Sequence, residues 1–349
     1  CTPAAPAVSF PQFLKHNDTQ GYNCCVIPKC AIDSIVESDF ATRKDLIVAK
    51  MQGLKVTILK INFSYKLPAK IKVYTGHGQS FTPYKSMVTI QNEDTITIFW
   101  KALKTSESFK HLCADLLWLK EHHWRNGSVV RVIYIDNCCQ NKVCLRNIFD
   151  HYVYILLDIW HWLKHWNLIL WDSTKAQAGC FRALMSWAVF MIEKAEWEHA
   201  KSKLEEKLNW APTKKEIAKE AKAIVLSPEL LGICVQKVLN YFFYLDLLAN
   251  LEKSSPGVLS AKEEPSTNTR LYMKSMNKET QTIIQNQLSH VDNSCLSDPP
   301  ADVVNIHRQN PWTGVVYTGR SAGSCEMDNR LLNHLLDSSH VAPSLACLL

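Results

Sequence analysis

Two aspartates follow apolar runs of the same kind in the middle of the chain. Residues 129–135 form a β-branched run that ends at Asp136, and residues 152–157 form a second run that ends at Asp158. Residues 141–149, which lie between the two runs, have the apolar spacing of a helix. This order predicts a strand, a helix and a second, parallel strand, with an aspartate at the C-terminal end of each buried strand.

Aspartates in these positions can do metal chemistry. Neighbouring strands lie about 5 Å apart, so two carboxylates at the same edge can share one hard divalent cation. Open α/β sheets also place their chemistry at the C-terminal edge of the parallel strands. The alternative is that Asp136 and Asp158 only cap the helices that follow them.

Length and composition restrict the class of protein. The 349 residues allow two or three average domains, or one domain with a large insertion, and 47% hydrophobic residues are ordinary for a globular protein. A formal charge of +6 slightly favours anionic partners. No stretch of about 18 apolar residues lacks charge, so we expect no membrane-spanning helix. Because the chain starts at Cys1, we expect an excerpt of a longer protein, in which targeting signals cannot be read.

Thirteen cysteines raise the question of disulfides or zinc. No Cys-x-x-Cys pair occurs, and several cysteines fall on apolar helix faces, which is typical of reduced cysteine in an intracellular protein. Cys24, Cys25, Cys30 and His16 could form part of a zinc site, which would make the chain a cysteine-based metal or redox protein.

The order of the predicted elements indicates a fold class. Residues 1–40 are rich in turn-forming residues and are predicted to be a linker or the end of an upstream region. The elements that follow are a helix over 41–51, strands over 55–63, 84–91 and 95–103, a helix over 106–122, and the strand–helix–strand unit above. Three antiparallel strands followed by two parallel ones are the order of the ribonuclease-H-like fold. We therefore predict an α/β protein with a mixed five-stranded sheet and helices on both faces.

The rest of the chain divides into an insertion and a return to the core. Residues 41–162 are predicted to be the first part of the ribonuclease-H-like core, and residues 163–290 a large all-α insertion. Residues 291–349 are predicted to complete the core, with a helix over 326–337 that carries Glu326 in its first turn.

Four segments in this order resemble the catalytic core of eukaryotic DDE transposases, particularly transposase-derived domains of fungal and animal genomes. They are Ile-Asn62-Phe-Ser-Tyr-Lys, Tyr-Ile-Asp136-Asn-Cys-Cys, Asp158-Ile-Trp-His161 and the stretch from Arg320 to Glu326. The resemblance covers roughly residues 40–349. A long helical insertion before the last acid is typical of such cores, and 190 residues separate Asp136 from Glu326.

The resemblance implies roles for particular residues. The catalytic positions are Asp136, Glu326 and Asn62, which stands where the family has its first aspartate, together with Asp158 of the Asp-x-x-His element. Asp136 and Glu326 would bind Mg²⁺ or Mn²⁺, and the supporting residues would be His161, Asn137 and Arg320. The resemblance also implies DNA as partner and a nuclear location. No membrane partner is expected, and a homo-oligomer is one option for the assembly.

Asn62 is the decisive departure from the family pattern. An amide is neutral and offers one ligating oxygen, so it replaces a bridging carboxylate poorly. The expected function is therefore a domesticated or decayed transposase core that is catalytically impaired and retained to bind DNA. An active enzyme that uses Asp158 as the substitute ligand is one alternative. Another is a non-catalytic helical interaction module on an α/β scaffold, which predicts separated acids and an exposed apolar patch between residues 160 and 250.

Two further groups of residues have two interpretations each. His161 and His165 lie one helical turn apart and could bind metal, but we favour His161 as a structural histidine that packs behind Asp158. Six basic residues could contact phosphate or could be ordinary surface residues, namely Lys66, Lys70, Lys72, Lys101, Lys104 and Arg131.

Overall fold

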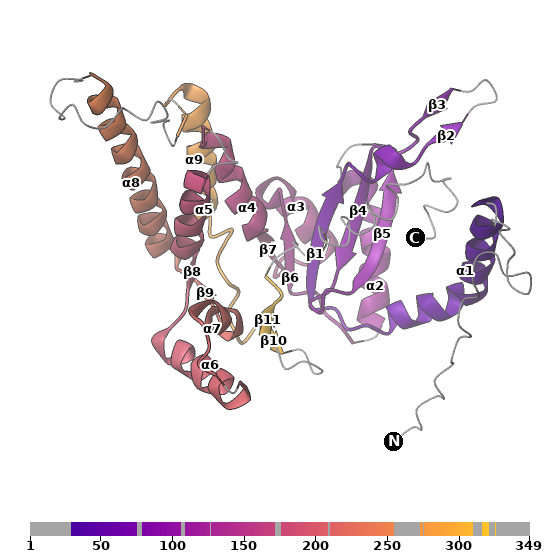
Figure 1. Cartoon of the computed structure of the whole chain (residues 1–349). Helices are drawn as coiled ribbons and strands as arrows, with labels where there is room; N and C mark the ends of the chain where they lie inside the picture. The colour runs from indigo at the N-terminus through magenta and orange to yellow at the C-terminus, as the bar shows by residue number, and fades with distance from the viewer. Residues whose placement is uncertain are drawn as a thin grey trace, which may run out of the picture.

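The structure is a computed structural model. It describes residues 29–74, 79–105, 109–125, 127–171, 176–208, 210–254, 273–274, 276–309, 316–320 and 325. Figure 1 shows a central sheet with a region of long helices beside it.

The sheet has five strands in the order β5-β4-β1-β6-β7. β1 pairs antiparallel with β4, and β4 pairs antiparallel with β5. β6 is parallel to both β1 and β7. The predicted mixed five-stranded sheet is therefore confirmed, with strands β1 (Ile58–Ser64), β4 (Ser86–Gln91), β5 (Thr97–Leu103), β6 (Val132–Ile135) and β7 (Tyr154–Leu157).

The two faces of the sheet are covered differently. Helices α2 (Cys113–Arg125) and α3 (Cys138–Ile148) contribute Leu116 and Leu145 to the core that includes Ile61 of β1. On the other face, Ile58 and its neighbours in β6 and β7 pack against Val304 and Ile306, which precede β10 (His307–Gln309). The described residues therefore place an extended segment on this face. The predicted helix over 326–337 lies outside the described residues.

The region after β7 is helical but not all-α. Two-residue strands β8 (Phe190–Met191) and β9 (Ile224–Val225) pair antiparallel, which corrects the predicted all-α insertion. Strands this short show no alternation in the sequence, so periodicity could not reveal them. The helices are α4 (Ile159–His165), α5 (Ala176–Val189), α6 (Lys194–Lys207), α7 (Lys214–Glu220), α8 (Pro228–Ser254) and α9 (Lys278–Asp292).

Helix α1 (Lys29–Gln52) begins earlier than predicted. Residues 29–40, predicted to be linker, are its first half, and residues 1–28 lie outside the described part. The helix predicted over 41–51 is therefore the second half of α1, and residues 41–50 are all exposed. The remaining short elements are β2 (Val73–Tyr74), β3 (Ser80–Phe81), β11 (Val316–Thr318) and the 3₁₀ turns η1 (Pro68–Lys70), η2 (Phe109–His111) and η3 (Trp166–Ile169).

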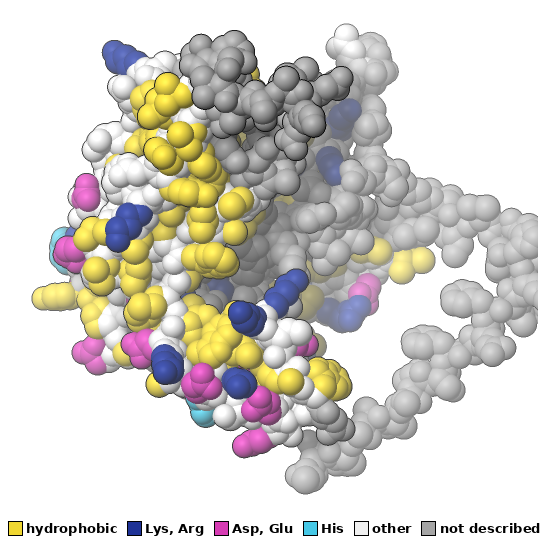
Figure 2. Space-filling model, turned by 60° about the vertical axis from the view of Figure 1, so that its left-hand side comes forward, with side chains coloured by type: hydrophobic (Ala, Val, Ile, Leu, Met, Phe, Trp, Pro, Cys, Tyr) yellow, Lys and Arg dark blue, Asp and Glu magenta, His cyan; other side chains and the backbone are white. Residues whose placement is uncertain are grey.

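Helix α8 carries an exposed apolar stripe. Its exposed members are Leu230, Ile233, Tyr241, Tyr244, Leu247, Leu248 and Leu251. Figure 2 shows hydrophobic side chains gathered on the face formed by the helical region. Among the described residues, Pro228–Leu251 is the one helical stretch long and apolar enough to cross a membrane, and length and composition alone are weak evidence for that. It contains Lys237 and Asp246, so the search for an uncharged window did not select it.

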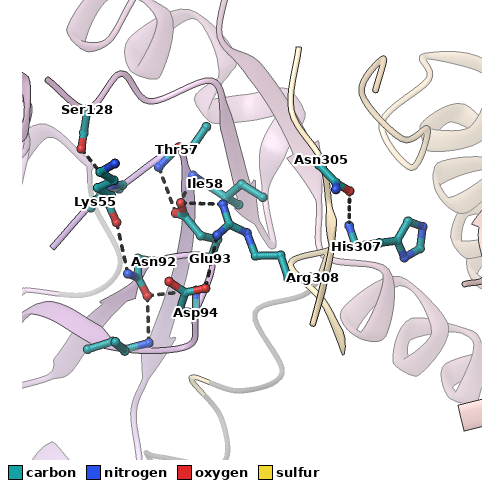
Figure 3. A network of polar contacts seen from close by, with 12 residues as sticks. Lys55, Thr57, Ile58, Asn92, Glu93, Asp94, Ser128, Asn305, His307 and Arg308 are labelled. Atoms are coloured by element: carbon teal, nitrogen blue, oxygen red, sulfur yellow. Dashed lines mark hydrogen bonds and ion pairs between the residues drawn. The ribbon is translucent and has the colours of Figure 1, made fainter. Parts of the chain in front are cut away.

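Glu93, in the turn between β4 and β5, ties together the end of the sheet opposite the aspartates (Figure 3). Its Oε2 accepts hydrogen bonds from the backbone N–H groups of Thr57 and Ile58, at 2.9 and 3.1 Å. Its Oε1 lies 3.0 Å from Nη2 of Arg308 in β10. Glu93 is 1% exposed, so one buried carboxylate joins the start of β1 to the segment that covers the sheet.

We expect Glu93→Ala to destabilise the protein by about 2–4 kcal/mol, because it leaves two backbone donors without their acceptor and removes the buried partner of the Arg308 guanidinium. The matched control is Asp94→Ala, which removes the exposed second partner of Arg308, 3.4 Å away, and should cost less than about 1 kcal/mol. Urea unfolding measures both changes. Equal losses in the two variants would contradict the role assigned to Glu93.

Candidate functional site

The parallel register of β6 and β7 brings Asp136 and Asp158 together. Ile135 pairs with Leu157 in the last pair of this ladder, and the backbone N–H of Asp158 donates to the carbonyl oxygen of Ile135 at 3.2 Å. Each aspartate directly follows one of these paired residues. Both carboxylates therefore leave the sheet at the same level of its C-terminal edge.

Asn62 occupies the corresponding position on β1. Lys60 pairs with Tyr134 in the parallel ladder of β1 and β6, and Asn62 and Asp136 each lie two residues further along. Because side chains two apart share one face of a strand, Asn62 is on the face that carries Asp136. Asn62 is 4% exposed. The structure thus brings three of the predicted site positions to one edge and one face of the sheet.

His161 of α4 links the two aspartates. Its Nδ1 lies 2.8 Å from Oδ1 of Asp136 and 2.7 Å from Oδ2 of Asp158. The predicted contact with Asp158 is present, and the contact with Asp136 was not predicted. Asp158 also caps α4, because its Oδ1 accepts a hydrogen bond of 3.0 Å from the backbone N–H of Trp160. The capping interpretation of Asp158 is confirmed, and its second oxygen contacts His161.

Asp136 is not a helix cap. The N-cap residue of α3 is Asn137, whose side chain makes no capping hydrogen bond. The buried Oδ1 of Asp136 has Nδ1 of His161 2.8 Å away and no other hydrogen-bond donor among the described residues. The capping interpretation is therefore wrong for Asp136, because Asn137 is the N-cap residue of α3.

The electrostatics of His161 follow from its two neighbours. Burial alone would lower the pKa of His161, but its hydrogen bonds to Asp136 and Asp158 and their charges outweigh burial and raise the pKa to about 10. At neutral pH the imidazolium therefore neutralises part of the charge of the two carboxylates.

The three side chains fit a divalent cation. One ligand atom from each of Asp136, Asp158 and His161 lies within 4.8 Å of the others. Asp136 and His161 border a pocket of about 390 Å³ that also reaches His165, and one wall of it comes from α9. Carboxylate oxygens suit Mg²⁺ and Mn²⁺, and an imidazole nitrogen is accepted more readily by transition metals. The pair of His161 and His165 does not form such a group in the described part of the chain.

Glu326 lies outside the described residues, but the residue before it is placed. Sγ of Cys325 is 3.5 Å from the carbonyl oxygen of Lys60 and is fully buried. Lys60 itself is 1% exposed. Burial lowers the pKa of Lys60, and the charges of Cys325, Glu93, Asp94 and Asp158 oppose this. Cys325 therefore packs on β1 at Lys60, which is two residues before Asn62 in the same strand.

Arg320, predicted to be a supporting residue of the site, pairs with Asp298. Its Nε and Nη2 each lie 2.5 Å from an oxygen of Asp298, and Nη2 also donates to the carbonyl oxygen of Ala223 at 3.0 Å. Oδ2 of Asp298 in turn accepts from the backbone N–H of Val225 in β9. Arg320 is 3% exposed and ties the C-terminal segment to the helical region; no described contact links it to the aspartates.

Sequence reasoning missed a second cluster. Sγ of Cys139 lies 3.3 Å from Sγ of Cys295 and 3.4 Å from Nδ1 of His290, and Cys138 completes the group. The hydrogen bond between Cys138 and Cys295 raises the pKa of Cys138, and burial raises it further. The same hydrogen bond lowers the pKa of Cys295 to about 4. The sequence features that could have indicated this cluster are the adjacent pair Cys138-Cys139 and the His-x₄-Cys spacing of His290 and Cys295. Of the predicted zinc residues, His16, Cys24 and Cys25 lie outside the described part, and Cys30 is in the first turn of α1.

The predicted basic residues differ in accessibility. Lys101 forms an ion pair of 2.8 Å with Asp115 of α2. Lys66, Lys104 and Arg131 are exposed, and Lys70 and Lys72 are half-buried. Lys66 follows β1 by two residues, so it lies near the edge of the sheet that carries Asn62.

Comparison with known proteins gives no identity. No protein-family model matches the chain, and no curated protein matches it. The function of the chain therefore has to be inferred from its residues and their geometry.

The imidazolium of His161 makes stability depend on pH in the metal-free protein. Its pKa is about 10 when folded against an ordinary 6.5, so its contribution is complete below pH 6.5 and is lost as the pH rises through 10. We expect wild type in chelator to lose on the order of 3 kcal/mol more than His161→Gln between pH 6.5 and 10. Urea unfolding at both pH values measures this difference.

The control for this experiment is His165→Gln. The pKa of His165 is lowered, first by burial and then by the charge of His161, so removing it should leave the wild-type pH dependence in place. A histidine signal assigned to His161 that titrates near 6.5 by NMR would contradict the ion pair.

Proposed function

We propose that the chain is a transposase-like nucleic-acid-processing core of the DDE type, catalytically impaired by Asn62 and retained to bind DNA. One observation carries this proposal. The carboxylates of Asp136 and Asp158 both lie within 2.8 Å of one imidazole nitrogen, at the ends of adjacent parallel strands, with Asn62 on the same edge. Paired carboxylates at this edge are suited to divalent-metal chemistry on phosphodiesters.

The sheet supports a ribonuclease-H-like core. The order β5-β4-β1-β6-β7, with β4 and β5 antiparallel to their neighbours and β6 and β7 parallel to β1, is the order that the transposase resemblance implies. The strand that carries Asn62 lies in the centre of the sheet, next to the strand that carries Asp136. Helices between β5 and β6 and between β6 and β7 agree with the same fold.

The chain's own residues explain both the proposed chemistry and its weakness. Asp136 and Asp158 would hold Mg²⁺ or Mn²⁺, which when bound can activate water and stabilise a leaving oxygen. His161 orients both carboxylates through Nδ1 and limits their repulsion. Asn62 brings no charge to this edge, so a second cation would be held weakly. Glu326 remains the predicted last acid.

Substituting Asn62→Asp should restore metal binding and DNA cleavage. A third carboxylate beside Asp136 raises the negative charge of the site, so we expect Mn²⁺ to stabilise Asn62→Asp more than wild type. Thermal unfolding with and without Mn²⁺ measures the stabilisation, and nicking of supercoiled DNA measures cleavage. Wild type should show little or no nicking.

The controls for this experiment are Asn62→Ala and the double variant Asn62→Asp with Asp136→Asn, and neither should cleave. Full cleavage by wild type would contradict impairment by Asn62 and favour Asp158 as the substitute ligand. If Asn62→Asp folds but neither binds Mn²⁺ nor cleaves, the proposed active-site geometry is wrong.

DNA binding should depend on exposed basic residues near the site. We expect Lys66→Glu and Lys104→Glu to weaken binding of duplex DNA and to reduce its salt dependence by about one counterion each. Electrophoretic mobility shift at two salt concentrations measures both. The matched control is Lys194→Glu, an exposed lysine of α6 in the helical region. Equal effects in all three variants would indicate non-specific attraction by net charge.

The second candidate is the non-catalytic interaction module. The exposed stripe on α8 favours it, whereas the convergence of Asp136 and Asp158 does not. The same Mn²⁺ measurement separates the two candidates, because an interaction module has no reason to gain metal affinity from Asn62→Asp.

A further inference from the structure

Three sulfur atoms and one nitrogen atom meet beside the pocket of the aspartates. The Sγ atoms of Cys138 and Cys139 are 3.8 Å apart, and Nδ1 of His290 lies 4.0 and 3.4 Å from them. The Sγ of Cys295 is 3.3 Å from that of Cys139. All four atoms lie within 4.8 Å of one another.

These distances fit one tetrahedral zinc ion. Zn–S bonds of about 2.3 Å and Zn–N bonds of about 2.0 Å at tetrahedral angles place sulfurs about 3.8 Å apart and sulfur and nitrogen about 3.5 Å apart. Four of the six separations are 3.3 to 4.0 Å, which surround these values, and the other two are within 4.8 Å. We propose that Cys138, Cys139, His290 and Cys295 bind one Zn²⁺ as a structural Cys₃His site.

Local structure places the first two ligands. Cys138 and Cys139 are the first two residues of α3, an 11-residue helix that begins directly after Asn137. The positive end of a helix dipole favours thiolate over thiol, which is the form that binds metal. Cys138 is buried and Cys139 is exposed, so the site is accessible from one side.

Backbone contacts hold the other two ligands in place. His290 is in the last turn of α9, and Ser294 has φ of 55°, a left-handed conformation that reverses the chain. The backbone N–H of Cys295 then donates to the carbonyl oxygen of His290 at 2.9 Å, and the carbonyl oxygen of Cys295 accepts from Leu157 of β7 at 2.8 Å. The backbone of α9 and its hydrogen bond to β7 therefore fix the positions of His290 and Cys295, independently of contacts between the side chains of the cluster.

The donor set selects zinc and a structural role. Three thiolates and an imidazole suit Zn²⁺ and are poor ligands for Mg²⁺. Four protein ligands leave no open position for water, which is the pattern of structural rather than catalytic zinc. This site is chemically distinct from that of Asp136, Asp158 and His161, where carboxylate oxygens predominate.

The geometry favours metal over a disulfide. The Sγ atoms of Cys139 and Cys295 are 3.3 Å apart, closer than those of Cys138 and Cys139 at 3.8 Å. A disulfide between Cys139 and Cys295 would not explain why Cys138 and His290 also lie within 4.0 Å of each other. A zinc ion uses all four donors. It would join the end of β6 to the end of α9, across 151 residues of sequence, and would hold Asn137 and the adjacent Asp136 in place.

Zinc content of the full-length chain, purified under reducing conditions and equilibrated with Zn²⁺, tests this proposal. We expect about one tightly held zinc per chain and tetrahedral thiolate absorption bands after Co²⁺ replacement. Chelation should lower the unfolding temperature of wild type. Cys295→Ser and His290→Ala should weaken zinc affinity by at least about 100-fold, because even an outer-shell change can cost 10–100-fold.

The matched control is Cys144→Ser, which changes a cysteine on the same helix α3 but outside the cluster and should keep the wild-type zinc content. Absence of bound zinc in folded wild type would overturn the proposal. So would a Cys139–Cys295 disulfide in the reduced preparation, or unchanged affinity in both ligand variants. The result is independent of the proposed function, because Asn62→Asp and DNA binding are measured on other residues.

Discussion

The parallel pairing of β6 and β7 is the constraint on which the site depends. Their register delivers two carboxylates to one edge of the sheet, where they would repel each other. Asp158 is fully buried, so this repulsion needs a positive partner within contact distance. His161 supplies it, because one turn of α4 returns its imidazole to both Asp158 and Asp136. A metal ion and a protonated histidine are thus two ways of satisfying the same carboxylates.

Long-range side-chain contacts hold the two ends of the sheet. At one end, buried Glu93 joins the start of β1 to Arg308, which is 215 residues further along the chain. At the other end, the Cys/His cluster joins the start of α3 to the end of α9. Arg320 and Asp298 connect the C-terminal segment to β9 of the helical region. The large insertion is therefore attached to the core at several points.

The two clusters illustrate how donor chemistry separates neighbouring sites. Asp136 and Cys138 are two residues apart, yet one belongs to a group with two carboxylates and the other to a group with three thiols. Hard cations prefer the first and zinc prefers the second, so both could be occupied without competition. If zinc fixes the start of α3, it also restricts the adjacent Asp136, which would link the stability of the fold to the geometry of the proposed site.

Periodicity and turn chemistry were sufficient to predict the five strands, their order and the ends at which Asp136 and Asp158 lie. Those features depend on local patterns of apolar residues, which a sequence displays directly. Contacts between distant residues had no such pattern: the double contact of His161, the role of Arg320, and the meeting of Cys138 and Cys139 with His290 and Cys295. Nothing in local spacing indicates that residues 139 and 290 are neighbours, since only the packing of α9 against the core brings them together. Residue types thus determined which metal-binding groups were available, and tertiary packing decided which of them come together in one site.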